Sequence, residues 1–154
     1  MPFKFNIDIA IEQLMDYVNS VDSYKKEPSK MIVNPEFQTY GLKTYDKILD
    51  YLDYIVQESE SIDIRIFHTL WEHKKCLEER IKYLSEYYTQ SVNFQQQIES
   101  LKYRTLQLKN LGLKYKMTKN NSILQHMKEI ITDIKNQEST CLKKYLTDLY
   151  AKIN

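Results

Sequence analysis

The residues best suited to metal chemistry are gathered on one predicted helix. His68, Glu72 and Cys76 are spaced by four, which places them on one helix face, and His73 offers a second pairing with Cys76. A single ion cannot bridge the set, because eight helical residues span about 12 Å. The Glu-x-x-His pairs of di-iron bundles are also missing from the sequence. We therefore interpret these residues as a surface cluster and expect no metal and no cofactor.

Motifs of covalent catalysis and phosphate binding do not occur in the sequence. It contains no Gly-x-Ser-x-Gly, no Cys-x-x-Cys and no glycine-rich phosphate loop. With only two glycines, Gly41 and Gly112, the chain has little of the loop structure on which active sites are usually built. We therefore expect that the protein is not an enzyme.

A run of positive charge between residues 102 and 128 is the strongest electrostatic feature. It contains seven basic residues, no acidic residue and the interleaved Tyr103 and Tyr115. Basic side chains neutralise phosphates and aromatic rings stack on bases, so nucleic-acid contact is one hypothesis. The other is contact with acidic protein surface. The candidate residues for either contact are Lys102, Arg104, Lys109, Lys114, Lys116 and Lys119.

The acidic surface that faces this run can belong to the chain itself. Residues 1–63 hold 6 Lys or Arg against 12 Asp or Glu, whereas residues 64–154 hold 16 against 9. Such asymmetry indicates either an external charged partner or two halves that lie against each other.

The elements that position these residues are predicted to be helices. From Glu36 to Asn154 there is no proline, and turn dipeptides between alternating runs are absent. Apolar residues at 3-4 spacing predict an N-terminal helical hairpin in residues 1–61, with helices over about 6–24 and 36–57. Asn6 is the expected N-cap of the first helix. Ser122 and Gln125 form a predicted capping box for a C-terminal helix over 122–154.

The central segment, residues 62–117, is predicted to be a long coiled-coil helix. Starting at Ile66 and stepping alternately by four and three residues as far as Tyr115, most positions hold apolar residues. This heptad spacing is typical of helices that supercoil around a partner helix. We expect a continuous rod, with a fold-back near residues 89–93 as the alternative. The partner helix comes from this chain or another. The residues expected to form the contact are Leu77, Leu84, Phe94, Ile98, Leu101 and Leu108.

These features predict an all-α, elongated helical hairpin or bundle of about four helices. Trp71, the only tryptophan, is expected either in the core or as an anchor for a partner. The apolar runs are too short to cross a bilayer, and two widely spaced cysteines favour an intracellular protein, cytoplasmic or nuclear. In organisation the chain resembles small helical subunits of kinetochore, spindle or vesicle-tethering complexes. The hypothesis is a non-enzymatic subunit that binds other helical proteins.

Overall fold

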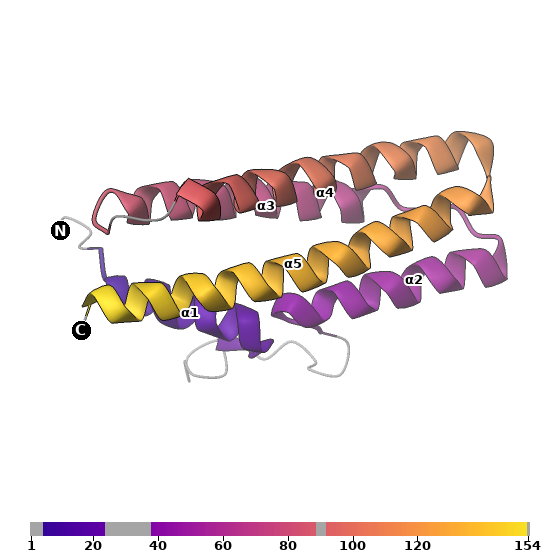
Figure 1. The fold of residues 1–154 in the computed structure, drawn as a ribbon. Helices are drawn as coiled ribbons and strands as arrows, with labels where there is room; N and C mark the ends of the chain where they lie inside the picture. The colour runs from indigo at the N-terminus through magenta and orange to yellow at the C-terminus, as the bar shows by residue number, and fades with distance from the viewer. Residues whose placement is uncertain (1–4, 24–37, 89–91, 154) are drawn as a thin grey trace.

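The computed structural model describes residues 5–23, 38–88 and 92–153, and within them the fold is entirely helical (Figure 1). The predicted all-α class is therefore confirmed. These residues form five α-helices, one more than the expected number of about four, and a short 3-10 helix, η3. Their bounds are α1 Ile7–Asn19, η3 Gly41–Lys43, α2 Thr44–Glu58, α3 Arg65–Ser85, α4 Val92–Thr118 and α5 Asn121–Ile153.

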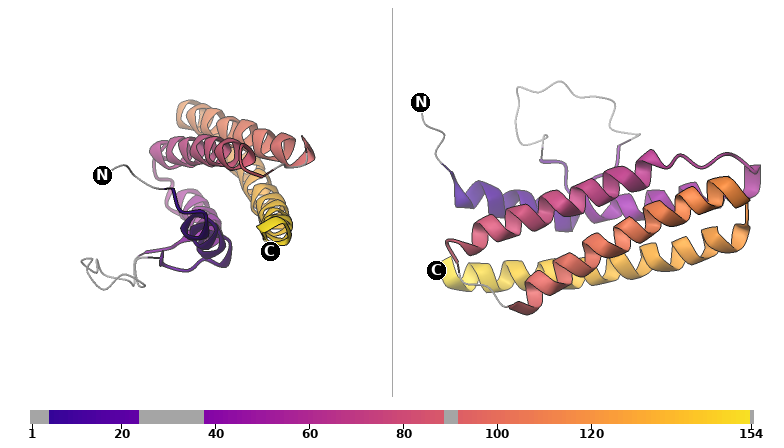
Figure 2. Two further views of the ribbon diagram at one scale, coloured as in Figure 1. Left: turned by 90° about the vertical axis from the view of Figure 1, so that its left-hand side faces the viewer. Right: turned by 90° about the horizontal axis from the view of Figure 1, so that it is seen from above.

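The helices form an elongated bundle with α5 as its longest member (Figures 1 and 2). At 33 residues, α5 is about 50 Å long. Helices α1 and α2 follow one another along one side of α5, while α4 lies antiparallel to α5 and pairs with α3 on its other side. No helix in the described ranges is both long enough and apolar enough to cross a membrane.

The prediction of one continuous helix over residues 62–117 is wrong. The segment contains α3 and α4, which fold back on each other as an antiparallel hairpin (Figure 2). After α3 ends at Ser85, the amides of Tyr87 and Tyr88 still donate to the carbonyl of Leu84, in a turn. Helix propensities differ by only tenths of a kcal/mol per residue, so they stop a helix weakly. Burying both halves of the apolar seam within one chain outweighs the lost helical turns.

The first helix begins and ends at residues with clear local roles. The Asn6 side chain accepts hydrogen bonds from the amides of Asp8 and Ile9, at 3.0 and 3.4 Å, which confirms the predicted N-cap. The helix stops at Asn19, short of the predicted Tyr24, because Ser20 adopts a left-handed conformation with φ of 57°.

The other two predicted helix starts also shift. Helix α2 begins at Thr44 rather than near residue 36, after Gly41 in the 3-10 turn. Gly41 has φ of +59°, and a Cβ there would lie 2.0 Å from the carbonyl oxygen of Tyr17, so glycine permits this close approach of η3 to α1. At the start of α5, the Asn120 side chain accepts from the Ser122 amide at 3.0 Å, so the cap lies two residues before the predicted Ser122.

The predicted contact seam is the core of this chain's own bundle. All six of its named residues are buried, and Leu84, Leu101 and Leu108 have no exposed area. The contact was predicted to be with a helix of this chain or of another, and the structure places it within the chain. These side chains have no surface left for an external partner.

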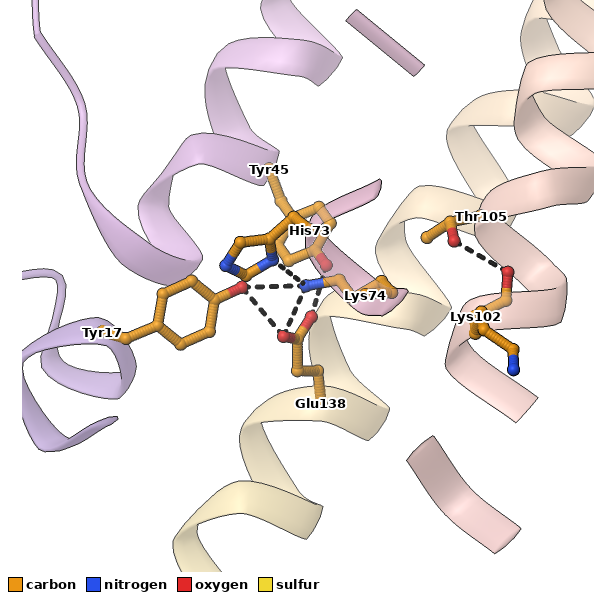
Figure 3. Close-up of polar contacts among 7 residues, drawn as sticks. All are labelled: Tyr17, Tyr45, His73, Lys74, Lys102, Thr105 and Glu138. Atoms are coloured by element: carbon orange, nitrogen blue, oxygen red, sulfur yellow. Dashed lines mark hydrogen bonds and ion pairs between the residues drawn. The ribbon is translucent and has the colours of Figure 1, made fainter. Parts of the chain in front are cut away.

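Two positions of the heptad series that do not hold a large apolar residue, Thr105 and Gly112, also fit inside the core. Thr105, fully buried, donates from its hydroxyl to the carbonyl of Lys102 at 2.9 Å (Figure 3). Gly112 lies beside the ring of Phe67, where an added Cβ would sit 3.4 Å away. A residue that is small, or whose hydroxyl is hydrogen-bonded within its own helix, lets α4 approach its neighbours closely at these positions.

We expect Leu101→Ala to lower the free energy of unfolding by about 2–5 kcal/mol, because it leaves a cavity in the core. Leu113→Ala is the matched control on the same helix: Leu113 is 38 % exposed, so its loss is expected to stay below about 1 kcal/mol. Urea denaturation of the purified protein measures both. Equal effects of the two substitutions would show that residue 101 does not face the bundle interior.

Candidate functional site

The most unusual site in the bundle is a group of polar side chains that runs from its interior to its surface, here called the polar cluster. It consists of Tyr17 from α1, Tyr45 from α2, His73 and Lys74 from α3, and Glu138 from α5 (Figure 3). Lys74 and Glu138 have no exposed area. Four helices thus bring one charged pair and three further hydrogen-bonding groups to a single point.

Lys74 is the donor at the centre of the polar cluster. Its ammonium nitrogen lies 2.6 Å from Glu138 Oε1, 3.0 Å from the Tyr17 hydroxyl and 3.2 Å from His73 Nδ1. An ammonium group has three donors and no acceptor, so each donor has one partner and Nδ1 must accept. The ring proton of neutral His73 is therefore on Nε2.

Glu138 is the acceptor that completes the polar cluster. Its Oε1 accepts from Lys74 and, at 2.8 Å, from the Tyr17 hydroxyl, while its Oε2 accepts from the Tyr45 hydroxyl. Throughout the described residues, no buried side-chain nitrogen or oxygen is left without a hydrogen bond. Because a buried polar group without a partner costs about 1–3 kcal/mol, full pairing is what makes the buried charges tolerable.

The protonation states follow from burial and from the carboxylate. Burial raises the pKa of Tyr17 and of Tyr45 well above its usual value, and the charge of Glu138 adds to this, so both hydroxyls stay protonated donors. Burial lowers the pKa of Lys74, and the adjacent carboxylate opposes that effect. The surrounding protein and then the Lys74 charge lower the pKa of His73 to about 4, in agreement with a neutral ring. Because the His73 side chain is exposed, the adjacent ammonium group is the more secure of these two causes.

A cleft of about 620 Å³ between α2 and α3 reaches the edge of the polar cluster. Its described lining includes Tyr17, Tyr45 and His73, but neither Lys74 nor Glu138. The charged pair is thus shielded from the cleft, and its hydrogen-bonding positions are filled from within the chain. A buried ion pair adds little net stability over apolar packing, but it penalises every arrangement that separates the two charges. We therefore expect the polar cluster to fix the register of α1, α2 and α3 on α5.

The predicted metal-capable residues lie at the surface of α3. His68 Nε2 is 3.9 Å from Glu72 Oε1, and Glu72 also pairs with Lys75 at 3.1 Å. Cys76 is an exposed free thiol. In the ranges that the structure describes, no group of three or more His, Cys, Asp or Glu side chains has the arrangement to hold a metal ion.

The basic run divides into residues used inside the chain and residues left at the surface. Lys102 pairs with Glu78 at 2.6 Å, and Arg104 pairs with Asp133 at 3.2 Å. Lys114, Lys116 and Lys119 are exposed, at the end of α4 and in the turn that follows it. These three are the exposed lysines of the basic run, although the Lys119 ammonium group also lies 5.7 Å from the centre of the Tyr115 ring.

The acidic N-terminal half is partly neutralised by α5. Lys128 pairs with Asp53 and Lys135 pairs with Asp46, each at 2.5 Å. These pairs, which join α2 to α5, support the interpretation that the two oppositely charged halves of the sequence lie against each other.

Trp71 is half-buried at the contact between α3 and α4. The ammonium groups of Lys75 and Lys109 lie 4.3 and 4.7 Å from the centre of its ring. A cation within about 6 Å of an indole face is attracted to it, so Lys109 ties α4 to α3 through this ring. The residue is thus an internal contact between helices.

Sequence analysis missed the polar cluster, although one signal for it exists. Glu138 occupies a core position in the apolar stripe of α5, between the buried Ile134 and Cys141. A carboxylate at such a position needs a buried partner. Lys74 carries no equivalent signal, because lysine next to an apolar stripe is common on helix surfaces.

We expect Lys74→Met to cost about 3–5 kcal/mol of unfolding free energy, because it leaves the Glu138 carboxylate buried without a cation. In the double variant with Glu138→Gln, the loss should be smaller than the sum of the two single losses, since no charge is left buried. Urea denaturation followed by circular dichroism measures this cycle.

Lys82→Met is the control for this cycle. It removes an ion pair with the exposed Glu79 at 3.1 Å and a longer one with the buried Glu78 at 3.5 Å. Because Glu78 keeps Lys102 at 2.6 Å, the loss is expected to be less than about 1 kcal/mol. The register role of the polar cluster would be contradicted if the double variant lost as much unfolding free energy as the two single variants together. It would also be contradicted if Lys74→Met were as stable as Lys82→Met.

Three comparisons with known proteins give no relative from which a function can be transferred. No protein-family model matches the chain, and no curated protein or solved structure matches it. What the protein does must therefore be inferred from its own surfaces.

Proposed function

We propose that the protein is a non-enzymatic interaction subunit that binds another protein through the outer face of α4. One observation carries this proposal: α4 has a second series of residues at 3-4-3-4 spacing, on the side opposite its buried seam. We call it the outer stripe. Its members are Tyr103, Leu106, Asn110, Leu113 and Met117.

The outer stripe is exposed where the inner seam is buried. Tyr103 is 69 % exposed, Leu113 38 % and Met117 86 %, while Leu106 is half-buried. A surface helix of a lone bundle normally has one apolar stripe and a polar opposite face. A helix that is apolar on two sides is typical of one that is covered on two sides, and clustered exposed apolar residues mark interaction surfaces.

The kind of assembly belongs to the same proposal. Long antiparallel helices with an outward apolar face suit a subunit that holds other helical proteins at a set distance, as in kinetochore, spindle or tethering complexes. Both cysteines are free thiols, one exposed and one buried, which supports an intracellular location, cytoplasmic or nuclear.

We expect Leu113→Glu and Met117→Glu to abolish co-purification of the partner from the native source, because each places a charge within the apolar contact. Their unfolding free energies should stay within about 1 kcal/mol of wild type, since both side chains are exposed. Quantitative mass spectrometry of tagged protein provides the measurement.

Val56→Glu is the matched control, because Val56 is an apolar residue of α2 with 42 % exposure. It should retain the same partners. If proteins held by wild type are held equally by both α4 variants, the outer stripe does not mediate assembly.

A second candidate function is nucleic-acid binding through the exposed Lys114, Lys116 and Lys119. We expect that, if this function is real, replacing all three by Glu removes binding, and that wild-type affinity falls steeply as salt rises. The same change at Lys143, Lys144 and Lys152, exposed on α5, is the control for net charge. Filter binding with duplex and single-stranded oligonucleotides tests it, and no retention even at low salt removes the candidate.

A further inference from the structure

The outer stripe of α4 is long enough to seat one helix. From Tyr103 to Met117 it covers 14 residue steps, or about 21 Å along the helix axis. This length is two heptads, and the 3-4 alternation is the spacing at which one helix receives the side chains of another. Its geometry therefore fits an α-helical ligand.

Basic residues border the outer stripe along both edges. Lys102, Lys109 and Lys116 precede its residues 103, 110 and 117 along one edge, and Lys114 follows Leu113 along the other. The sequence holds no acidic residue from Ser100 to Lys128. Glu78 neutralises Lys102, so the positive edge is strongest over the second half, from Lys109 to Lys116.

The charge of these edges selects among possible helical occupants. In a helix pair, residues bordering the apolar seam lie beside those of the partner, where opposite charges attract and like charges repel. A second copy of this chain would place lysines beside lysines, whether the two α4 helices ran parallel or antiparallel. An occupant with acidic edges meets attraction along both sides.

Asn110 at the middle of the outer stripe indicates a protein partner. The residue is exposed, and a polar amide in the seam of a helix pair sets register by hydrogen bonding to a polar residue opposite. A lipid surface would offer this amide no such matched partner at one defined position.

On these grounds, and resting on the proposed function, we propose that the outer stripe binds one amphipathic helix of a different protein, with an apolar seam bordered by Glu or Asp. The partner helix carries a polar residue opposite Asn110. Its acidic residues lie beside Lys109, Lys114 and Lys116.

Two synthetic peptides of about four heptads test the charge requirement directly. They share a leucine seam with one central asparagine, and differ only in Glu or Lys at the bordering positions. We expect the full-length protein to bind the Glu peptide at least about tenfold more tightly than the Lys peptide, by fluorescence anisotropy at about 50 mM salt. The preference should shrink at about 300 mM salt, where exposed charges are screened.

Variants of α4 assign the binding to the outer stripe. Met117→Glu should weaken the Glu peptide at least about tenfold, and Val56→Glu should leave it unchanged. In the double variant Lys114→Glu with Lys116→Glu, the Lys peptide should bind more tightly than the Glu peptide. Neither unfolding nor non-specific binding would reverse the preference in this way.

Several outcomes would overturn the inference. Equal affinity for both peptides, binding to neither, or tighter binding to phosphatidylserine vesicles or duplex DNA would each reject an acidic helix as the occupant. Dimerisation in sedimentation that Met117→Glu abolishes would identify a second copy instead. Even then, the proposed function stands if Met117→Glu loses the proteins that co-purify with wild type from the native source. If Met117→Glu retains them, the proposed function fails, whatever the peptides show.

Discussion

The pairing of Lys74 with Glu138 is the constraint on which the bundle depends. Removing two charges from water costs several kcal/mol per ion, and one salt bridge does not repay this unless the remaining donors and acceptors are also satisfied. The hydroxyls of Tyr17 and Tyr45 and the ring of His73 supply those partners. Because these groups come from different helices, α1, α2 and α3 must all be in place on α5 before the pair is tolerated. The short α1 is thereby held to the long hairpins by more than its apolar face.

Ion pairs between α2 and α5 account for part of the division of the sequence into an acidic and a basic half. Asp46 and Asp53 of α2 lie against Lys135 and Lys128 of α5, across the boundary between the halves. Exposed pairs of this kind contribute little stability each, but they favour the arrangement of helices that the polar cluster fixes. Part of the charge that suggests a binding site along the sequence is therefore paired within the chain. The exposed lysines that remain include a group at the end of α4 and another on α5.

Helix α4 shows how equal spacing can serve two purposes. Its inner seam, with Leu101 and Leu108, is fully buried, while its outer stripe exposes Tyr103 and Met117 at the same alternation of three and four. The inner seam stabilises the bundle of this chain, and its buried side chains are closed to other chains. Any association must use outer faces, and on α4 that face combines apolar residues with lysine borders.

The sequence alone determined the all-α class, the start of α1 at its Asn6 cap, the C-terminal helix and the residues of the apolar seam. These follow from periodicity and capping, which act over one or two helical turns. Only the tertiary structure decided that residues 62–117 make a hairpin. The helix propensities between Ser85 and Phe94 are too weak to decide whether a helix continues there, whereas burial of the seam in a hairpin does. It alone brought together Tyr17, Tyr45, Lys74 and Glu138, residues up to 121 positions apart along the chain. No local pattern links such residues, since a buried charge is tolerated only where the folded chain supplies its partner.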